Sequence, residues 1–597
     1  MKFLAVACVL LALAEVGFSL DREAFTFTKY DLNVQLEPEQ QRLAARGTVT
    51  LRNDSSSPQK VAVLQISSSL TWRSIQAEGK PLQFVSQPYE SDIDHTGELS
   101  EAIVTLPKEV PPAGSVELQI GYEGVIVLDA TRLTRIGVPK ETAIHSDWDQ
   151  ISVASSAVRG VGNVAWYPVA MESANLSEGN SVFETLGRWR AKSAASTMQV
   201  GLCVEVLSTE VGRWSLLMNN IQRGDAGGGG IGGSDHDPHV SVCGWQAFQP
   251  LGQIVPTFAV APYEQIATGG LAIYFLPIRK SEAQAFVQAA ERVRGFVTEW
   301  LGAPRSQVRV VELADAGTSP YEAGTILLTP LNDTDPQLLQ IVMVHELAHA
   351  AFASPRLWIS EGSAHFLQAA YREQQSGRAS ALDFMGLHRA AMADAERAAT
   401  AVGKGDSSKG MTESGESPAA RPSDAGANSL VSTTVDEFAR SKAAYVWWML
   451  RDTIGEDSLK KALANYHPEQ DKDAAYMQHL IEAQTNRDLK WFFDDWVYHD
   501  RGLPDFRVES AFARKASQDN YLVTVTVENL GAAGAEVPVT VDFDGGETTQ
   551  RVEVRGNAKG TIRVATPKPP TQVVVNDGSV PESDMSNNVF KVERSNQ

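Results

Sequence analysis

Hydrophobic and polar residues alternate along most of the first 260 positions of this chain. Short alternating stretches at residues 30–36, 47–51 and 116–120 are separated by Gly, Pro, Asn and Ser. A period of two is typical of strands that bury one face. The pattern therefore predicts a β-rich N-terminal domain over residues 20–265.

From about residue 270 the period changes to that of an amphipathic helix. Apolar residues recur every three to four positions in Ala-rich runs at 283–300, 336–352, 361–375, 439–452 and 459–466. We expect a mainly helical domain over residues 266–505. Residues 400–432 interrupt it with Ser, Gly and Ala and almost no large apolar side chains, which predicts a mobile insert that cannot fold alone and that could cover a neighbouring cleft.

Alternation returns after Pro504, in residues 521–527, 537–543 and 561–564. Asp544-Gly545 and Asp577-Gly578 are hairpin signals between such strands. About 90 residues of this kind favour an Ig-like β-sandwich over residues 506–597. The predicted fold is thus multidomain, with a β-rich part, a helical part and a second β part.

Residues 1–19 resemble a secretory signal, because Met1-Lys2 precedes an apolar run and a cleavage position near Ser19. That run is shorter than the roughly 20 residues that span a bilayer. We expect a soluble exported protein, periplasmic or extracellular, with an uncleaved anchor as the alternative. In an oxidising compartment Cys203 and Cys243 are expected to form a disulfide, and two buried thiols are the alternative.

Charge and composition narrow the function classes. The 597 residues are 43 % hydrophobic and carry a net charge of -21, which argues against nucleic acid and anionic membranes as partners. The glycine-rich stretch 223–239 contains Gly-x-Gly-x-x-Gly, but no helical pattern follows, so a dinucleotide site is rejected. Its Asp235-His236-Asp237-Pro238-His239 cluster is interpreted as a surface loop in preference to a metal site.

One short motif predicts a reaction. His345, Glu346 and His349 form a His-Glu-x-x-His pattern inside the apolar helical run 336–352. Four residues apart on a helix, the two imidazoles lie on one face and can bind one zinc ion, with Glu346 as general base for an activated water. The alternative is a helix with two surface histidines, yet burying unpaired imidazoles costs free energy that a metal and its neighbouring acceptors offset.

A catalytic zinc needs a third protein ligand. The helix is expected to end near Pro355, and Glu361 then opens a second helix that a short link would fold back over the histidine pair. Glu361 is therefore the predicted third ligand, and a first-turn glutamate stabilised by the helix dipole is the alternative. His365 is predicted either as a group beside the site or as a partly exposed helix histidine.

The pairing of this motif with Trp358-Ile-Ser-Glu361-Gly362 resembles the gluzincins, in particular the M1 aminopeptidase family. The resemblance extends to a helix and strand over residues 281–312, to the segment 442–450 and to the segment 491–497. It implies an N-terminal β-saddle, a thermolysin-like catalytic domain, one Zn²⁺ bound by His345, His349 and Glu361, and a peptide substrate.

The chain also departs from the family pattern. The link between the second histidine and Glu361 is shorter, and the family's amine-anchoring Gly-x-Met-Glu-Asn motif is absent. Glu322 stands near that place and is a candidate anchor for a substrate amine, with a carboxylate in a turn as the alternative. Arg440 replaces the family's oxyanion-stabilising tyrosine, and Tyr445 is a second candidate, with a core tyrosine as the alternative.

Together these features predict an exported zinc metallopeptidase that acts on peptides or unfolded protein. Aminopeptidase, endopeptidase and Peptidase MA-like activities remain open at this level. The rival prediction is a non-catalytic binding scaffold derived from an M1 peptidase, since fold alone does not guarantee activity. The sequence predicts no oligomeric state.

Overall fold

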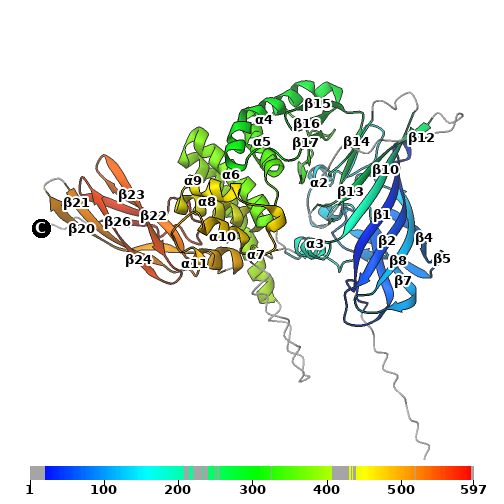
Figure 1. The fold of residues 1–597 in the computed structure, drawn as a ribbon, viewed down its shortest axis with the longest axis horizontal. Helices are drawn as coiled ribbons and strands as arrows, with labels where there is room; N and C mark the ends of the chain where they lie inside the picture. The colour runs from blue at the N-terminus through cyan, green and yellow to red at the C-terminus, as the bar shows by residue number, and fades with distance from the viewer. Residues whose placement is uncertain are drawn as a thin grey trace, which may run out of the picture.

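The computed structural model describes residues 20–592 apart from 180, 208–213, 220–230, 233–238, 249–250, 252–253, 325, 406–428, 432, 434–437, 500 and 518–519. Sheets, helices and sheets follow one another in the predicted order, and the helical part lies between the two β-rich parts (Figure 1). The predicted signal, the 235–239 cluster and most of the predicted insert lie outside the described side chains. Among the described residues, no helix is both long and apolar enough to cross a membrane.

The N-terminal part is built on one large sheet, coloured from blue to green in Figure 1. Its strand order is β12 (Ile231–Gly232), β13 (His239–Phe248), β10 (Thr197–Leu207), β1 (Phe25–Glu37), β2 (Arg42–Asn53), β8 (Ser115–Val125), β4 (Leu70–Ala77) and β5 (Lys80–Pro81). Tyr30, Leu32, Val34 and Leu36 on β1 are all buried, which confirms the alternation. Cys203 and Cys243 are paired across β10 and β13 and form a disulfide.

Smaller sheets and short helices complete this part. Residues of the large sheet share a hydrophobic core with the three-stranded sheet β3 (Gln59–Ser67), β7 (Glu98–Val110) and β6 (Phe84–Glu90). A second three-stranded sheet has the order β11 (Ser215–Met218), β14 (Phe258–Ala261) and β9 (Ser156–Val158). The helices are α1 (Thr131–Arg135), α2 (Lys140–Ser146) and α3 (Ser181–Lys192).

The middle part begins with a five-stranded sheet. Its order is β15 (Glu264–Thr268), β16 (Leu271–Phe275), β17 (Val308–Glu312), β19 (Ile326–Thr329) and β18 (Tyr321–Ala323). β15 pairs only with β16 among the described strands, so the boundary expected after residue 265 falls inside β15. β18 is an edge strand that runs antiparallel to β19, and this edge carries Glu322.

The predicted helices are present with shifted ends. They are α4 (Lys280–Leu301), α5 (Pro336–Ala351), α6 (Leu357–Ser376), α7 (Arg378–Gly405), α8 (Ala443–Ile454), α9 (Glu456–Ala464), α10 (Tyr476–Glu482) and α11 (Lys490–Phe493). A π-helical turn, Phe438–Lys442, precedes α8, so the helix expected over 439–452 is not uniform. α7 reaches Gly405 and therefore extends into the segment 400–432 that was expected to lack structure.

The C-terminal part is a sandwich of two sheets. One has the order β20 (Phe506–Ser517), β21 (Asn520–Asn529) and β24 (Lys559–Thr566), and the other β23 (Gly546–Val554), β22 (Ala535–Phe543), β25 (Pro570–Val575) and β26 (Val589–Lys591). The turn at residues 544–545 joins β22 to β23 as expected. Residues 577–578 also lie between two paired antiparallel strands, β25 and β26, but the tight turn expected there is wrong: β26 begins only at Val589, and Asn576 binds Val580 and Glu582 within a longer loop.

The sandwich packs against the helical part. Its buried valines belong to the same hydrophobic cluster as the side chains of α4 to α9. Trp496 also donates from its indole nitrogen to the Gly534 carbonyl at 2.7 Å. This shared core fixes the C-terminal sheets on the helices.

Candidate metal centre

α5 places the His-Glu-x-x-His motif in the interior. The helix starts with Pro336 at its first position, and Asp335 accepts hydrogen bonds from the next two backbone amides, a stable N-terminal cap. His345 is 6 % exposed and Glu346 1 % exposed. The Nε2 atoms of His345 and His349 lie 3.1 Å apart, so the predicted pair shares one face of the helix.

A buried polar cluster holds the short link between α5 and α6. Tyr466 donates to Asp471 at 2.6 Å, and Ser354 lies 2.7 Å from the Tyr466 hydroxyl. Arg356 donates to the other oxygen of Asp471 at 2.7 Å. These bonds fix the chain just before α6, and so they set where that helix begins.

Trp358 and Gly362 dock α6 against α8. The Trp358 ring stacks on Trp447 with centroids 5.6 Å apart, and the Trp447 indole donates to the Trp358 carbonyl at 3.1 Å. A Cβ at Gly362 would lie 2.5 Å from the Ala443 Cβ. Only a glycine permits this approach, and Glu361 is thereby held on the side of α6 that faces the histidine pair.

Replacing Gly362 with Ala is expected to lower the free energy of unfolding by about 1–3 kcal/mol, because the added methyl forces two helices apart. The gain in helix propensity, about 1 kcal/mol, offsets only part of this. Urea unfolding monitored by tryptophan fluorescence measures the difference. Gly386→Ala on α7 is the matched control, since its Cβ would meet nothing within 4 Å. Equal losses in the two variants would contradict the packing argument.

Two carboxylates converge on the histidine pair. Glu322 lies 2.9 Å from His345 Nε2 and 3.4 Å from His349 Nε2, and Glu361 lies 3.6 Å from His349 Nε2. Ligand atoms around a tetrahedral zinc are about 3.4 Å apart, given bonds of about 2.0–2.2 Å. The residues present therefore fit a zinc ion with little movement.

Glu322 reaches this group from the edge strand β18. The sequence predicts an amine anchor or a carboxylate in a turn here, and Glu322 lies in a strand and not in a turn. The groups whose donor atoms could hold a metal are Glu322 with His345 and His349, and Glu361 with His345 and His365. Two glutamates thus lie close enough to bind the metal, where the sequence predicts one glutamate ligand.

Burial shapes the electrostatics of the site. Together with the charges of Glu322 and Glu361, burial raises the pKa of Glu346 well above its ordinary value. Burial alone would raise the pKa of Glu322, but the neighbouring His345 and His349 lower it. His345 Nδ1 and Glu346 Oε2 are buried and have no hydrogen-bond partner among the residues that the structure describes. A bound divalent cation would offset the free-energy cost of burying these polar groups, and it would favour the ionised form of Glu346.

His365 continues the histidine cluster on α6. Its ring lies 4.6 Å from that of His345 and 5.0 Å from that of His388 on α7, measured between centroids. Burial and the positive charges nearby lower the pKa of His365 well below its usual range and that of His388 to about 4. His365 is half-buried on α6 and lies beside His345, so each of the two predictions for it holds in part.

Arg440 borders the site at its open side. Its Nε lies 3.6 Å from Glu361, and its side chain is 47 % exposed. It lines a cavity of about 70 Å³ together with Arg190, Tyr321, Glu322 and Glu361. The π-helical turn thus places Arg440 where a substrate beside the two carboxylates could contact it.

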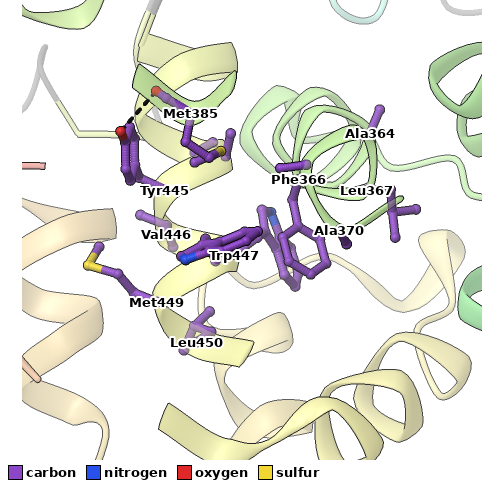
Figure 2. Close-up of a cluster of buried hydrophobic side chains, with 14 of the residues drawn as sticks. Ala364, Phe366, Leu367, Ala370, Met385, Tyr445, Val446, Trp447, Met449 and Leu450 are labelled. Atoms are coloured by element: carbon purple, nitrogen blue, oxygen red, sulfur yellow. Dashed lines mark hydrogen bonds between the residues drawn. The ribbon is translucent and has the colours of Figure 1, made fainter. Parts of the chain in front are cut away.

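Tyr445 does not reach the cavity. Its side chain is 1 % exposed, and its hydroxyl donates to the Met385 carbonyl at 2.9 Å (Figure 2). It packs in the cluster formed by α6, α7 and α8. The structure therefore corrects the prediction that Tyr445 serves as an oxyanion donor, because the hydroxyl is buried in the core and bound to a backbone carbonyl.

No family model and no curated protein matches this sequence. Among solved structures, aminopeptidase A of Legionella pneumophila, in complex with aspartic acid, has a TM-score of 0.55 at 12 % identity, over 96 % of this chain and 60 % of that chain. An M1 zinc metallopeptidase of Deinococcus radiodurans, bound to a Tyr-Ser-Ala substrate, has a TM-score of 0.45 at 14 % identity, over 81 % and 96 %. At these identities the likeness to the Legionella enzyme shows a shared fold.

Proposed function

We propose that this chain is a zinc metallopeptidase of the gluzincin type, similar to the M1 aminopeptidases. The observation that carries the proposal is the convergence of His345, His349 and two carboxylates beside the buried Glu346, whose Oε2 has no hydrogen-bond partner among the described residues. A zinc ion held by His345, His349 and Glu361 fits these positions. The fold shared with the Legionella aminopeptidase supports the same conclusion.

When bound, zinc polarises the scissile carbonyl and makes water a nucleophile at neutral pH. Glu346 then accepts the proton of the attacking water and delivers it to the leaving amine. Its Oε2 has no hydrogen-bond partner in the described part of the chain, so it is available for this transfer. The rival scaffold role gives no reason to keep an unpaired carboxylate in the interior.

Glu322 and Arg440 take the two remaining roles at the cavity. Glu322 borders both the cavity and the metal position, so its carboxylate is placed to hold the free amino group of a substrate. The Arg440 guanidinium replaces the missing tyrosine and stabilises the oxyanion, an effect commonly worth about 3 kcal/mol in the transition state. An endopeptidase or Peptidase MA-like mode is the alternative for the same machinery.

The flanking parts and the compartment complete the proposal. The N-terminal sheets act as the saddle that walls the cleft, and the C-terminal sandwich is an Ig-like module docked on the catalytic helices. Both favour peptides or unfolded segments over folded proteins as substrates. The predicted signal and the disulfide favour an exported enzyme.

Metal removal tests the proposal. Dialysis against a chelator is expected to abolish cleavage of unblocked peptides, and stoichiometric zinc to restore it. Pairs of peptides with a free or an acetylated amino end distinguish aminopeptidase from endopeptidase activity. If Glu322 holds the substrate amine, acetylation is expected to lower kcat/KM by tenfold or more. Zinc-loaded protein that leaves both peptides intact would contradict the proposed function, and equal cleavage of the two would assign the endopeptidase mode.

A further inference from the structure

His365 occupies a defined place on the helix that carries Glu361. The two residues are four apart on α6, so their side chains leave the same face of the helix. α5 offers His345 and His349 with the same spacing. Two facing helices thus present two pairs of donor groups to one another.

Hydrogen bonds fix which nitrogen of His365 carries a proton. Gln368 donates from its amide nitrogen to the Ile341 carbonyl at 3.0 Å, so its amide oxygen points the other way. That oxygen lies 3.0 Å from His365 Nδ1 and can only accept. Nδ1 is therefore the protonated nitrogen, and the lone pair of the neutral ring is on Nε2.

His365 belongs to a group of possible metal ligands. One donor atom each of His345, Glu361 and His365 lies within 4.8 Å of the other two. The Gln368 bond orients the ring in the way that outer partners usually orient a metal-binding imidazole. A ring that merely filled space beside His345 would need no such orientation.

We propose that His365 is a further ligand of the metal, through Nε2, so that the site holds zinc with three imidazoles and Glu361. The proposal rests on the function proposed above and extends its metal site beyond His345, His349 and Glu361. A fourth protein ligand would slow the loss of the ion. Catalytic zinc sites can expand from four to five ligands.

His388 is the natural comparison. Its ring lies beside His365, but its Nδ1 lies 3.0 Å from the Ser441 hydroxyl, and it belongs to neither group of donor atoms. Because it is a similarly placed histidine without a donor atom near the metal position, replacing it changes the surroundings of His365 and leaves the ligand set unchanged.

X-ray absorption at the zinc edge tests the proposal on the zinc-loaded, full-length protein. The multiple-scattering signal gives the number of imidazole rings bound to zinc. We expect three rings in the wild type and in His388→Gln, and two in His365→Gln. Competition with a chromophoric chelator should show zinc affinity at least tenfold lower in His365→Gln and within threefold of wild type in His388→Gln.

The number of imidazole rings bound to zinc in the wild type tests the assignment of His365 even if a variant fails to fold. Two imidazoles in a wild-type protein that binds zinc and cleaves peptides would overturn the assignment of His365 and leave the proposed function intact. A wild-type protein that binds no zinc would overturn both. An unchanged ring count in folded His365→Gln would also overturn the assignment.

Discussion

Glu346→Gln is expected to lower kcat by about two to four orders of magnitude, the range that general acid–base groups contribute. The amide has almost the shape of the carboxyl group but cannot accept the proton of the attacking water. Glu346 lies between His345 and His349 in sequence and bonds to neither, so the metal ligands should keep their positions. Steady-state kinetics on a peptide substrate measures the loss.

Zinc content must be determined on the same sample, because the loss has to arise with the metal in place. One zinc per chain is expected in both the wild type and Glu346→Gln. Glu291→Gln, an exposed glutamate on α4, is the matched control and should keep its activity. Turnover retained by zinc-loaded Glu346→Gln would rule out Glu346 as the general base.

Glu361→Ala is expected to lose most of the bound zinc. Removing a primary ligand weakens binding by more than the 10–100-fold typical of outer partners. Glu322→Ala is the matched variant, because it removes the other carboxylate in reach of His349. It should retain zinc and instead lose the preference for a free amino end.

Metal analysis after gel filtration through metal-free buffer separates the two carboxylates. Zinc lost from Glu361→Ala and kept in Glu322→Ala supports the assignment. The reverse result would make Glu322 the third ligand and would move the amine anchor elsewhere. Full occupancy in both variants would mean that other groups hold the ion.

Much of the fold could be predicted, because most elements carry a strong period. The alternation in β1 and the apolar stripe of α4 arise from burying one face, whereas α5 is apolar on most sides because most of its side chains are buried. Features set by tertiary contacts were missed. β15 joins the middle sheet through its pairing with β16, and the loop after Gly578 is held by bonds of Asn576, neither of which leaves a periodic signal.

The residues of the site also divide into those that the sequence predicts and those that only the fold brings together. His345, Glu346 and His349 follow from one helix, and Glu361 follows from a short link to the next. Glu322 reaches the histidines only because an edge strand lies beside α5, which no local pattern encodes. The family resemblance suggested Glu322, yet its 2.9 Å approach to His345 required the fold.

Only the structure shows in which direction the side chains of Tyr445 and His365 point. Tyr445 is directed into the core by its position on α8, where its hydroxyl binds the Met385 carbonyl. The role of His365 depends on Gln368, whose own orientation is set by the Ile341 carbonyl on another helix. A chain of contacts between helices cannot be read from spacing within either one.

Mass spectrometry of a mixed peptide library tests the central claim most directly. The zinc-loaded mature protein is incubated with the library beside zinc-loaded Glu346→Gln and a chelator-treated sample. Products in the wild type that vanish in both other samples are predicted, with stepwise shortening from free amino ends for an aminopeptidase. A library left intact by zinc-loaded wild-type protein would contradict the claim that this site hydrolyses peptide bonds.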